Sequence, residues 1–439
     1  MGAYLTYEGA WGAIVFIFCL SLCSLRLSKS RKFEAIDFSI LSMGLVYGAL
    51  FPIVMDQKSE AKIHGQEFLE SMRHISYAHP ISVMIAACGL IVGWQAVSAK
   101  KRSACGQYFS QISTKGLSIW VCVMLSISVI TQYLYVYDYG GIFGYFSYNR
   151  LIRSGLFDSF ERSRFSFLKP FGAFSTLAFL CSWGLLLSGK RGFLNIILFI
   201  ISLMVAMYVA VAGGGRVSMV TLLAILPFSI LIRFGVSYKL WFILYFAMAA
   251  LGVFGLFWIS YFLELKSAEN ISSYIARESS FVFVSFFANL QGGDFLYLFY
   301  EVLIWPAFLI PSSLTNSWLF SATDLNTMLI YGSAKGADGI TGSIPTDIIT
   351  FGFMQLHFIG VFLYPVILGY FLRIVSELSY SFRDAGLSSA FTSYVMLKVG
   401  VFAIFYSYPK HLIMSHFGIL AALMVIFMLR LMRRFSKRY

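Results

Sequence analysis

Basic side chains that could bind phosphate are concentrated at a few points of this 439-residue chain. One group occupies the stretch "YFSYNRLIRSGLFDSFERSRFSFLK" and consists of Arg150, Arg153, Arg162, Arg164 and Lys169. The guanidinium group of arginine binds phosphate oxygens through two parallel hydrogen bonds. The structural alternative for each of these residues is pairing with lipid headgroups or with the acids Asp158 and Glu161 of the same stretch.

A second candidate anion site is the stretch "VAGGGRVSMV", in which Gly214 and Gly215 precede Arg216. Glycines let a backbone approach a ligand closely, and the free amides at the start of a helix attract anions. An arginine beside them completes a plausible phosphate site. The alternative is a tight turn followed by an arginine that reaches towards the membrane surface.

Further titratable residues lie at the edges of apolar segments. Arg277 and Glu278 stand side by side in "YIARESSFVFV", so that Arg277 is a second candidate for phosphate and Glu278 is either a base or its charge partner. Lys410 and His411 lie in "YSYPKHLIM", where His411 is either a base or a histidine at the membrane interface with no catalytic role. Lys398 lies inside an apolar run, and ionisable residues within membrane spans are usually functional because they are costly there.

Motifs for nucleotides and metals are missing from the sequence. There is no GxxxxGK[ST] or GxGxxG fingerprint, no HExxH, and no His/Cys cluster at ligand spacing. We therefore expect chemistry that uses neither ATP nor a cofactor and is independent of metal. The cysteines all fall in predicted spans or on the predicted inner side, which argues against a disulfide framework.

The elements that must position these residues are predicted to be transmembrane helices. The chain is 59% hydrophobic and only 12% charged, and apolar runs of membrane-spanning length recur along it. We predict a single all-α integral membrane domain over 1–439, a polytopic bundle of about eleven spans. The predicted spans are 10–25, 36–55, 77–98, 116–137, 170–188, 193–212, 217–234, 240–262, 349–372, 386–406 and 411–429.

The net charge of +13 reflects membrane topology rather than a nucleic-acid partner. The predicted inner segments carry far more Lys and Arg than Asp and Glu, whereas acidic residues slightly outnumber basic ones in the outer segments. This positive-inside bias predicts an N-terminus outside and a C-terminus inside.

Long predicted outer segments carry most of the candidate residues. The segments 138–169 and 263–348 are expected to form the active-site region, because loops of this length in compact proteins are usually functional. The second contains the apolar stretch 295–311, "FLYLFYEVLIWPAFLIP". We predict that it is re-entrant or lies in the interface, and the alternative is a twelfth span.

The end of this loop resembles a family signature. The sequence "GADGITGSIPTDIITFGFMQLHFIGVFLYPVILGYFL" is similar to the C-terminal signature of the bacterial O-antigen and oligosaccharide repeat-unit polymerases. The matching positions are Gly342, Ser343, Asp347, Phe351, Gly352 and Gly360. The "GGGR" at 213–216 is similar to a small-residue-plus-Arg turn of that family. The chain has Pro311–Ser312 where the family often has Pro–Arg.

The resemblance implies a GT-C-like, inverting glycosyltransferase of the bacterial inner membrane with a large helical periplasmic loop. Its substrates would be oligosaccharides on undecaprenyl pyrophosphate, and its partners would include the lipid bilayer, a chain-length regulator and a flippase of the same pathway. Arg216, Arg277 and the arginines of 150–164, with Lys410, would stabilise the departing pyrophosphate. Asp347, Glu278 and His411 are the candidate bases for the acceptor hydroxyl.

Two other functions fit parts of the pattern. An O-antigen ligase would act on similar lipid-linked donors, but ligases usually carry a His-containing motif where this chain has "GSIPTD", and 263–348 contains no histidine. A transporter or flippase is the alternative from another class. Transporters commonly have related halves, and the sequence has none that we detect, although Lys398 within a span suits such a function.

Overall fold

The computed structural model describes residues 7–56, 65–97, 116–154, 163–212, 216–262, 271–293, 296–310, 319, 321–340 and 342–421. Within these residues all regular secondary structure is helical, which confirms the predicted all-α class. Eight segments are long and apolar enough to cross a membrane. The chain is therefore a helical, multi-pass membrane protein.

The membrane-length segments match eight of the predicted spans. They are α1 (Tyr7–Ser30), α2 with η2 and α3 (Ala35–Met55), α5 (Ala78–Gln95), α7 (Leu117–Tyr137), η4 with α9 (Ser166–Leu187), α10 (Phe193–Ala212), α17 (Ile348–Tyr380) and α18 with η6 and α19 (Ala385–Phe405). The seventh and eighth predicted spans lie in α11 (Arg216–Arg233) and α12 (Tyr238–Phe262), whose apolar stretches are shorter. The eleventh is described only as far as residue 421, so the count of eleven and the orientation of the termini stay predictions.

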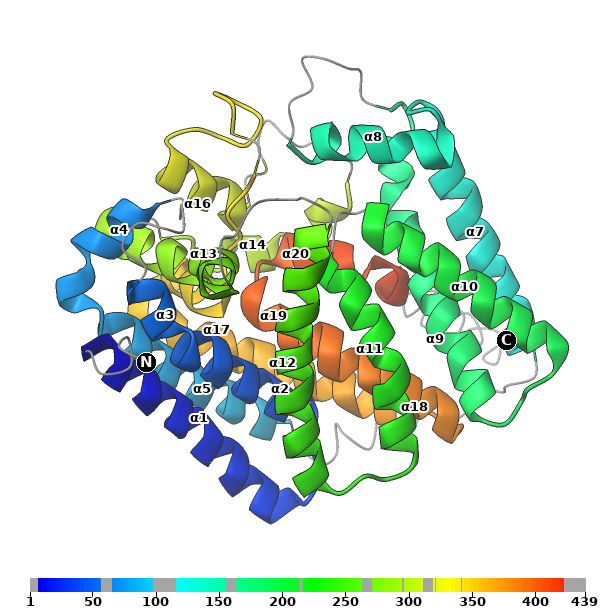
Figure 1. Cartoon of the computed structure of the whole chain (residues 1–439), viewed down its shortest axis with the longest axis horizontal. Helices are drawn as coiled ribbons and strands as arrows, with labels where there is room; N and C mark the ends of the chain where they lie inside the picture. Colours follow the sequence, from blue (N-terminus) through cyan, green and yellow to red (C-terminus); the bar gives the residue numbers. More distant parts are fainter. Residues whose placement is uncertain are drawn as a thin grey trace, which may run out of the picture.

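Several shorter helices gather towards one end of the bundle (Figure 1). α4 (Gln66–Ser71), α8 (Gly141–Ser154) and α16 (Ala322–Tyr331) lie at this end, and the turn between α11 and α12 lies at the other. The predicted outer segment 138–169 contains α8. The segment 263–348 contains α13 (Ile271–Gly292), α14 (Tyr300–Leu303), η5 (Trp305–Leu309) and α16, so it is largely helical in its described part.

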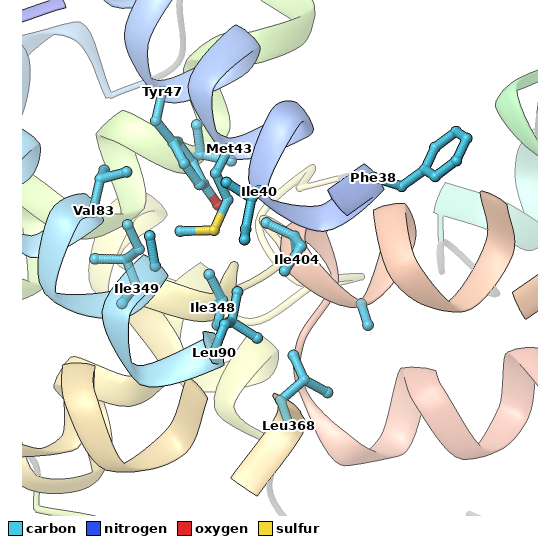
Figure 2. Close-up of a cluster of buried hydrophobic side chains, with 14 of the residues drawn as sticks. Phe38, Ile40, Met43, Tyr47, Val83, Leu90, Ile348, Ile349, Leu368 and Ile404 are labelled. Atoms are coloured by element: carbon cyan, nitrogen blue, oxygen red, sulfur yellow. The ribbon is translucent and has the colours of Figure 1, made fainter. Parts of the chain in front are cut away.

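The centre of the bundle is an apolar core shared by segments far apart in the sequence. Figure 2 shows Met43 and Tyr47 of the second membrane segment close to Val83 of α5, Ile348 of α17 and Ile404 of α19. All five side chains are almost completely buried. Because this core joins the second, third, ninth and tenth predicted spans, it fixes how the candidate residues on these helices face one another.

Glycines let α5 and α17 approach to backbone contact. A Cβ atom at Gly93 would lie 1.9 Å from the Val366 carbonyl oxygen, and one at Gly369 would lie 2.2 Å from that of Leu90. Gly89 and Gly93 are spaced as in the small-xxx-small motifs that bring membrane helices together. Since no larger residue fits, these glycines set the separation of the two helices.

The predicted ninth span differs from the prediction because α17 is broken near its start. Leu356 and His357 have non-helical backbone angles, and the φ of His357 is 49°. Phe351 and Tyr364, on either side of the break, have ring centroids 4.6 Å apart. In a continuous helix their positions along the axis would differ by about 20 Å. The N-terminal arm (348–355) therefore folds back along the C-terminal arm (358–380).

Gly352 and Gly360 make this hairpin possible. A Cβ atom at Gly360 would lie 2.0 Å from the Gly352 carbonyl oxygen, so the two arms touch through their backbones. The carbonyl oxygens that the break leaves free are used by the preceding loop. The backbone N–H groups of Tyr297 and Leu298 donate to the carbonyls of Met354 and Gln355, at 3.0 and 3.2 Å. The family-like Phe-Gly…Gly signature thus encodes a helical hairpin.

The apolar stretch 295–311 does not form a single helix in its described part, 296–310. It contains the four-residue α14 and the five-residue η5 instead, neither of which is long enough to cross a membrane. Leu298 and Phe299 adopt positive φ values where the chain pairs with the α17 break. This arrangement does not support a twelfth span and agrees with a re-entrant or interfacial segment.

Candidate functional site

Lys398 is the centre of a polar cluster within the membrane domain. It lies in η6 (Val395–Val401), a π-helical segment, and π-segments are frequent at functional sites. Its ammonium group donates a hydrogen bond to Ser218 Oγ at 3.0 Å. It also lies 4.1 Å from the centre of the Phe402 ring. The ammonium is thereby held beside the first turn of α11.

The first turn of α11 brings the predicted "GGGR" anion site to the same place. Arg216 is the first residue of α11 and stands two positions before Ser218. The first backbone N–H groups of a helix have no partner within it, and they form its positive end. Lys398 therefore adds a positive charge to a helix start that already favours anions. The side chain of Arg216 and residues Gly214 and Gly215 lie outside the described part of the chain.

His411 is linked to Lys398 through the rings of Phe402 and Tyr406, which stack on each other with centroids 6.0 Å apart. It belongs to α20 (Pro409–Ser415), and its ring stacks on that of Tyr406 with centroids 5.0 Å apart. Its Nε2 atom is 3.0 Å from Ser415 Oγ. Burial, with a smaller contribution from the Lys398 charge, lowers the pKa of His411 to about 4. The imidazole is consequently neutral at pH 7 and able to accept a proton.

Arg277 is connected to this cluster through α13. Phe281, one turn later on the same helix, stacks on Tyr406 with ring centroids 5.8 Å apart. Residues four apart share a helix face, so Arg277 lies on the face of α13 that packs beside Tyr406. Its guanidinium is 5.8 Å from the centre of the Tyr274 ring. Two of the predicted phosphate-binding positions, 216 and 277, are thus on helices that border one cluster.

The electrostatic balance of the cluster is positive. Within the described residues, no carboxylate forms an ion pair with Lys398, whose ammonium is instead held by a hydroxyl and an aromatic ring. A cation placed in a membrane segment is costly unless an opposite charge or dipoles compensate it. The cluster therefore combines an ammonium that has no ion-pair partner among the described residues with a neutral imidazole.

The side chains of the other predicted site residues make no described contact with Lys398 or are only partly described. Lys410 is 3.8 Å from Asp324, in a pair with both side chains partly exposed. Arg164 is exposed, and its backbone N–H donates to Asp138. Glu278 is exposed on α13. The backbones of Arg150 and Arg153 lie in α8, and their side chains are outside the described part.

Asp347 is buried completely and caps the N-terminal arm of α17. Its Oδ1 atom accepts a hydrogen bond from the Thr350 backbone N–H at 3.0 Å, and its Oδ2 accepts one from the Tyr47 hydroxyl at 2.7 Å. Both carboxylate oxygens therefore have structural partners. Its assignment as a base stays a prediction, while the capping function is seen directly.

The loop before Asp347 is also more buried than a sugar-facing loop would be. Thr346 is fully buried, and the Asn326 side chain donates to the Ile344 carbonyl at 3.0 Å. Ser285 of α13 donates to the Pro345 carbonyl at 3.3 Å. Only the beginning of "GSIPTD", Gly342 and Ser343, is exposed. The polar residues of this loop mainly hold it between α13 and α16.

Sequence reasoning did not single out Glu301 or Ser218. Glu301 is fully buried, and its Oε2 atom accepts a hydrogen bond from the Ala322 N–H at the start of α16, at 2.9 Å. Burial raises its pKa to about 7. The only sequence signal for Glu301 was an acid within an apolar stretch. Ser218 had none, because its function depends on Lys398 from a distant helix.

Comparisons of the chain with protein-family models, with curated proteins and with solved structures find no match. Among the described residues, no group of three or more His, Cys, Asp or Glu side chains is arranged to hold a metal ion.

Proposed function

We propose that this protein is an O-antigen polymerase, a periplasmic-side glycosyltransferase that joins oligosaccharide units carried on undecaprenyl pyrophosphate. The observation that carries the proposal is the Lys398 ammonium at the start of α11, which forms no ion pair with a carboxylate of the described residues. A lipid-linked pyrophosphate supplies the missing negative charge. It also accounts for an anion site within a membrane domain, because its prenyl chain remains in the bilayer.

The proposed reaction forms one glycosidic bond and breaks another. The acceptor hydroxyl of an incoming unit attacks the anomeric carbon of the growing chain, and the bond from that carbon to the pyrophosphate oxygen breaks with inversion. The negative charge that develops on the pyrophosphate is stabilised by Lys398, Arg216 and Arg277 together with the amides of α11. Fixed cations and dipoles directed at the developing charge lower the barrier of such reactions.

We place the general base at His411 in preference to Asp347 and Glu278. The proton of the acceptor hydroxyl passes to its neutral imidazole as the new bond forms. General bases of this kind contribute roughly a hundred- to ten-thousand-fold to rate. His411 is suited to this task because it lies in the Lys398 cluster and stays unprotonated at neutral pH. Asp347, in contrast, has both oxygens engaged by Tyr47 and Thr350.

Substitutions at Lys398 test the proposal in cells. We expect Lys398→Met to insert normally and to leave lipopolysaccharide with a single repeat unit, because the uncharged side chain cannot stabilise the pyrophosphate. Lys398→Arg should retain part of the long-chain ladder. Arg216→Ala and Arg277→Ala should also shorten the ladder. Lys239→Met, which removes an exposed cation from the start of α12, is the matched control. Full ladders from Lys398→Met, Arg216→Ala and Arg277→Ala would refute the proposal.

The broken helix α17 favours a flippase as the second candidate. Transporters often place their substrate at discontinuous helices, and the hairpin at Leu356 and His357 is such a feature. A deletion strain distinguishes the functions. Lipid A core bearing one unit indicates a polymerase. Bare core with inward-facing carrier-linked units indicates a flippase, and bare core with carrier-linked polymer indicates a ligase.

A further inference from the structure

A second cavity lies at the opposite end of the helices that carry the proposed site. It has a volume of about 640 Å³ and lies between the end of α9, the start of α10 and the end of α11. Arg191 and Arg233 are the charged residues that line it. The charge bias of the sequence predicts that this end of the bundle faces the cytoplasm. The cavity is therefore separate from the predicted periplasmic chemistry.

The two arginines come from different elements and have no acidic neighbour in the lining. Arg191 belongs to the turn between α9 and α10, and Arg233 is the last residue of α11. Asp384, a carboxylate near the end of α9, accepts hydrogen bonds from Ser188 and from the first amides of α18. It does not line the cavity. Two guanidinium groups thus face one space without a counter-charge in its lining.

Another arginine-lined cavity in the described chain shows the contrast. It has a volume of about 510 Å³, and its arginines Arg26 and Arg373 are both neutralised. Arg26 pairs with Glu34 and Asp37, and Arg373 pairs with Glu34 and Glu377. Arginines in this protein can therefore be satisfied by acids from neighbouring helices. No acidic residue of the described chain lines the cavity at Arg191 and Arg233.

The remaining walls of this cavity are apolar and one of them is fixed in place. The indole N–H of Trp183 donates to Ser229 Oγ at 2.6 Å, and its ring lies 5.1 Å from that of Phe199. Ile230 extends the wall, and Phe234 at the rim is 81% exposed. The apolar part of a ligand can therefore extend from the arginines along Trp183 towards the surrounding bilayer.

We propose that this cavity binds an anionic phospholipid, with Arg191 and Arg233 on the phosphodiester group and an acyl chain along Trp183, Ile230 and Phe234. Basic pockets between membrane helices at the cytoplasmic face are suited to anionic headgroups. Arginine pairs hold phosphate oxygens by charge-assisted hydrogen bonds. The apolar walls favour a lipid over a free phosphate, because only a lipid fills both parts of the cavity. This site is independent of the proposed polymerase activity.

Lipid retention by the purified protein tests the proposal. The protein is exchanged into a neutral detergent, and binding of phosphatidylglycerol and phosphatidylcholine is measured by native mass spectrometry. We expect at least tenfold stronger retention of phosphatidylglycerol, and we expect Arg191→Gln/Arg233→Gln to abolish the preference. Lys29→Gln/Lys239→Gln removes the same charge at the same end of the bundle and should leave the preference unchanged.

A second measurement uses the unmodified protein, so the test does not depend on the folding of the variant. Phosphatidylglycerol with brominated acyl chains should quench the fluorescence of Trp183. The Trp183→Phe variant lacks this tryptophan, so the same lipid should quench its fluorescence less. Equal binding of the two lipids would overturn the proposal. Quenching that is the same with and without Trp183 would also overturn it. Displacement of the lipid by millimolar inorganic phosphate would identify a free-anion site instead and would refute the lipid assignment.

Discussion

The Tyr47 hydroxyl donates a hydrogen bond to Asp347 Oδ2 at 2.7 Å, although the two residues are 300 positions apart. Both side chains are completely buried. Tyr47 lies in η2, the π-helical part of the second membrane segment, and Asp347 begins the hairpin of α17. This contact therefore ties the hairpin to the core of the bundle.

Tyr47→Phe should destabilise the protein, because it leaves a buried carboxylate oxygen without its donor. The loss of such a partner costs about 1–3 kcal/mol. The midpoint of thermal unfolding in detergent measures the effect. Tyr133→Phe, which alters a tyrosine that is 50% exposed, serves as the control and should not change the midpoint. An unchanged midpoint for Tyr47→Phe would show that the contact contributes little to stability.

Asp347→Asn separates a capping function from a catalytic one. Asparagine is also a good N-cap, so the variant should fold and retain most of the proposed polymerase activity. If Asp347 were the general base, the same change would reduce activity by roughly a hundredfold or more. The length of the lipopolysaccharide ladder, compared at equal protein abundance, decides between these outcomes.

Gly360→Ala should disrupt the α17 hairpin, since the added Cβ atom would clash with the Gly352 carbonyl oxygen. Overpacking of this kind typically costs about 1–3 kcal/mol. Gly252→Ala in α12 is the matched control, because nothing lies within 4 Å of a Cβ atom there. Thermal unfolding of the two variants should differ clearly. Similar midpoints would contradict the close packing of the two arms.

Glu301 should make stability fall as the pH rises. Its pKa is raised to about 7 by burial, so the folded state binds its proton more tightly than the unfolded state, in which an ordinary pKa near 4.5 applies. The stabilisation is complete below about pH 4.5 and is lost as the pH rises through 7; its upper limit is about 3 kcal/mol. Glu301→Gln, which keeps the acceptor for Ala322, should flatten this part of the pH profile. If Glu301→Gln lost stability with rising pH in the same way as the wild type, Glu301 would be ruled out as the source of that loss.

His411, in contrast, should make stability fall as the pH falls. Its pKa is lowered to about 4, so the unfolded state takes up a proton before the folded state does. Its contribution to stability is present above about pH 6.5 and is lost as the pH falls through 4. A reaction that needs the neutral imidazole should likewise fail below about pH 4. His411→Gln should remove the acidic limb from the rate profile of polymerisation in vitro, at a much reduced rate. An acidic limb that persists in the variant would exclude His411 as the base.

Hydrophobic pattern alone predicted the helical class and eight of the membrane segments correctly. At the ninth segment it identified the membrane helix but missed the break, because "FGFMQLHFIG" lies in a largely apolar run and reads as one span. Hydropathy does not record a backbone reversal, and the glycines at 352 and 360 are equally compatible with a straight helix. The tertiary structure shows the reversal through the backbone angles at Leu356 and His357 and the contact between Phe351 and Tyr364.

The candidate site was likewise predicted only in part from the sequence. Residue type and spacing identified Arg216, Arg277 and His411 as candidates, because cations and histidines at helix ends stand out in an apolar chain. They could not show that Ser218 lies beside Lys398, since the two are 180 positions apart and a serine in a span carries no signal of its own.

The sequence by itself therefore determined that the chain forms membrane helices, because the transfer of apolar side chains into lipid depends on local composition. Tertiary structure alone decided which charges have partners. Asp347 accepts a hydrogen bond from Tyr47 and Lys398 donates one to the neutral hydroxyl of Ser218, and each partner comes from a distant helix. Electrostatic interactions in a membrane protein depend on distances between helices, and only the packing of the helices sets those distances.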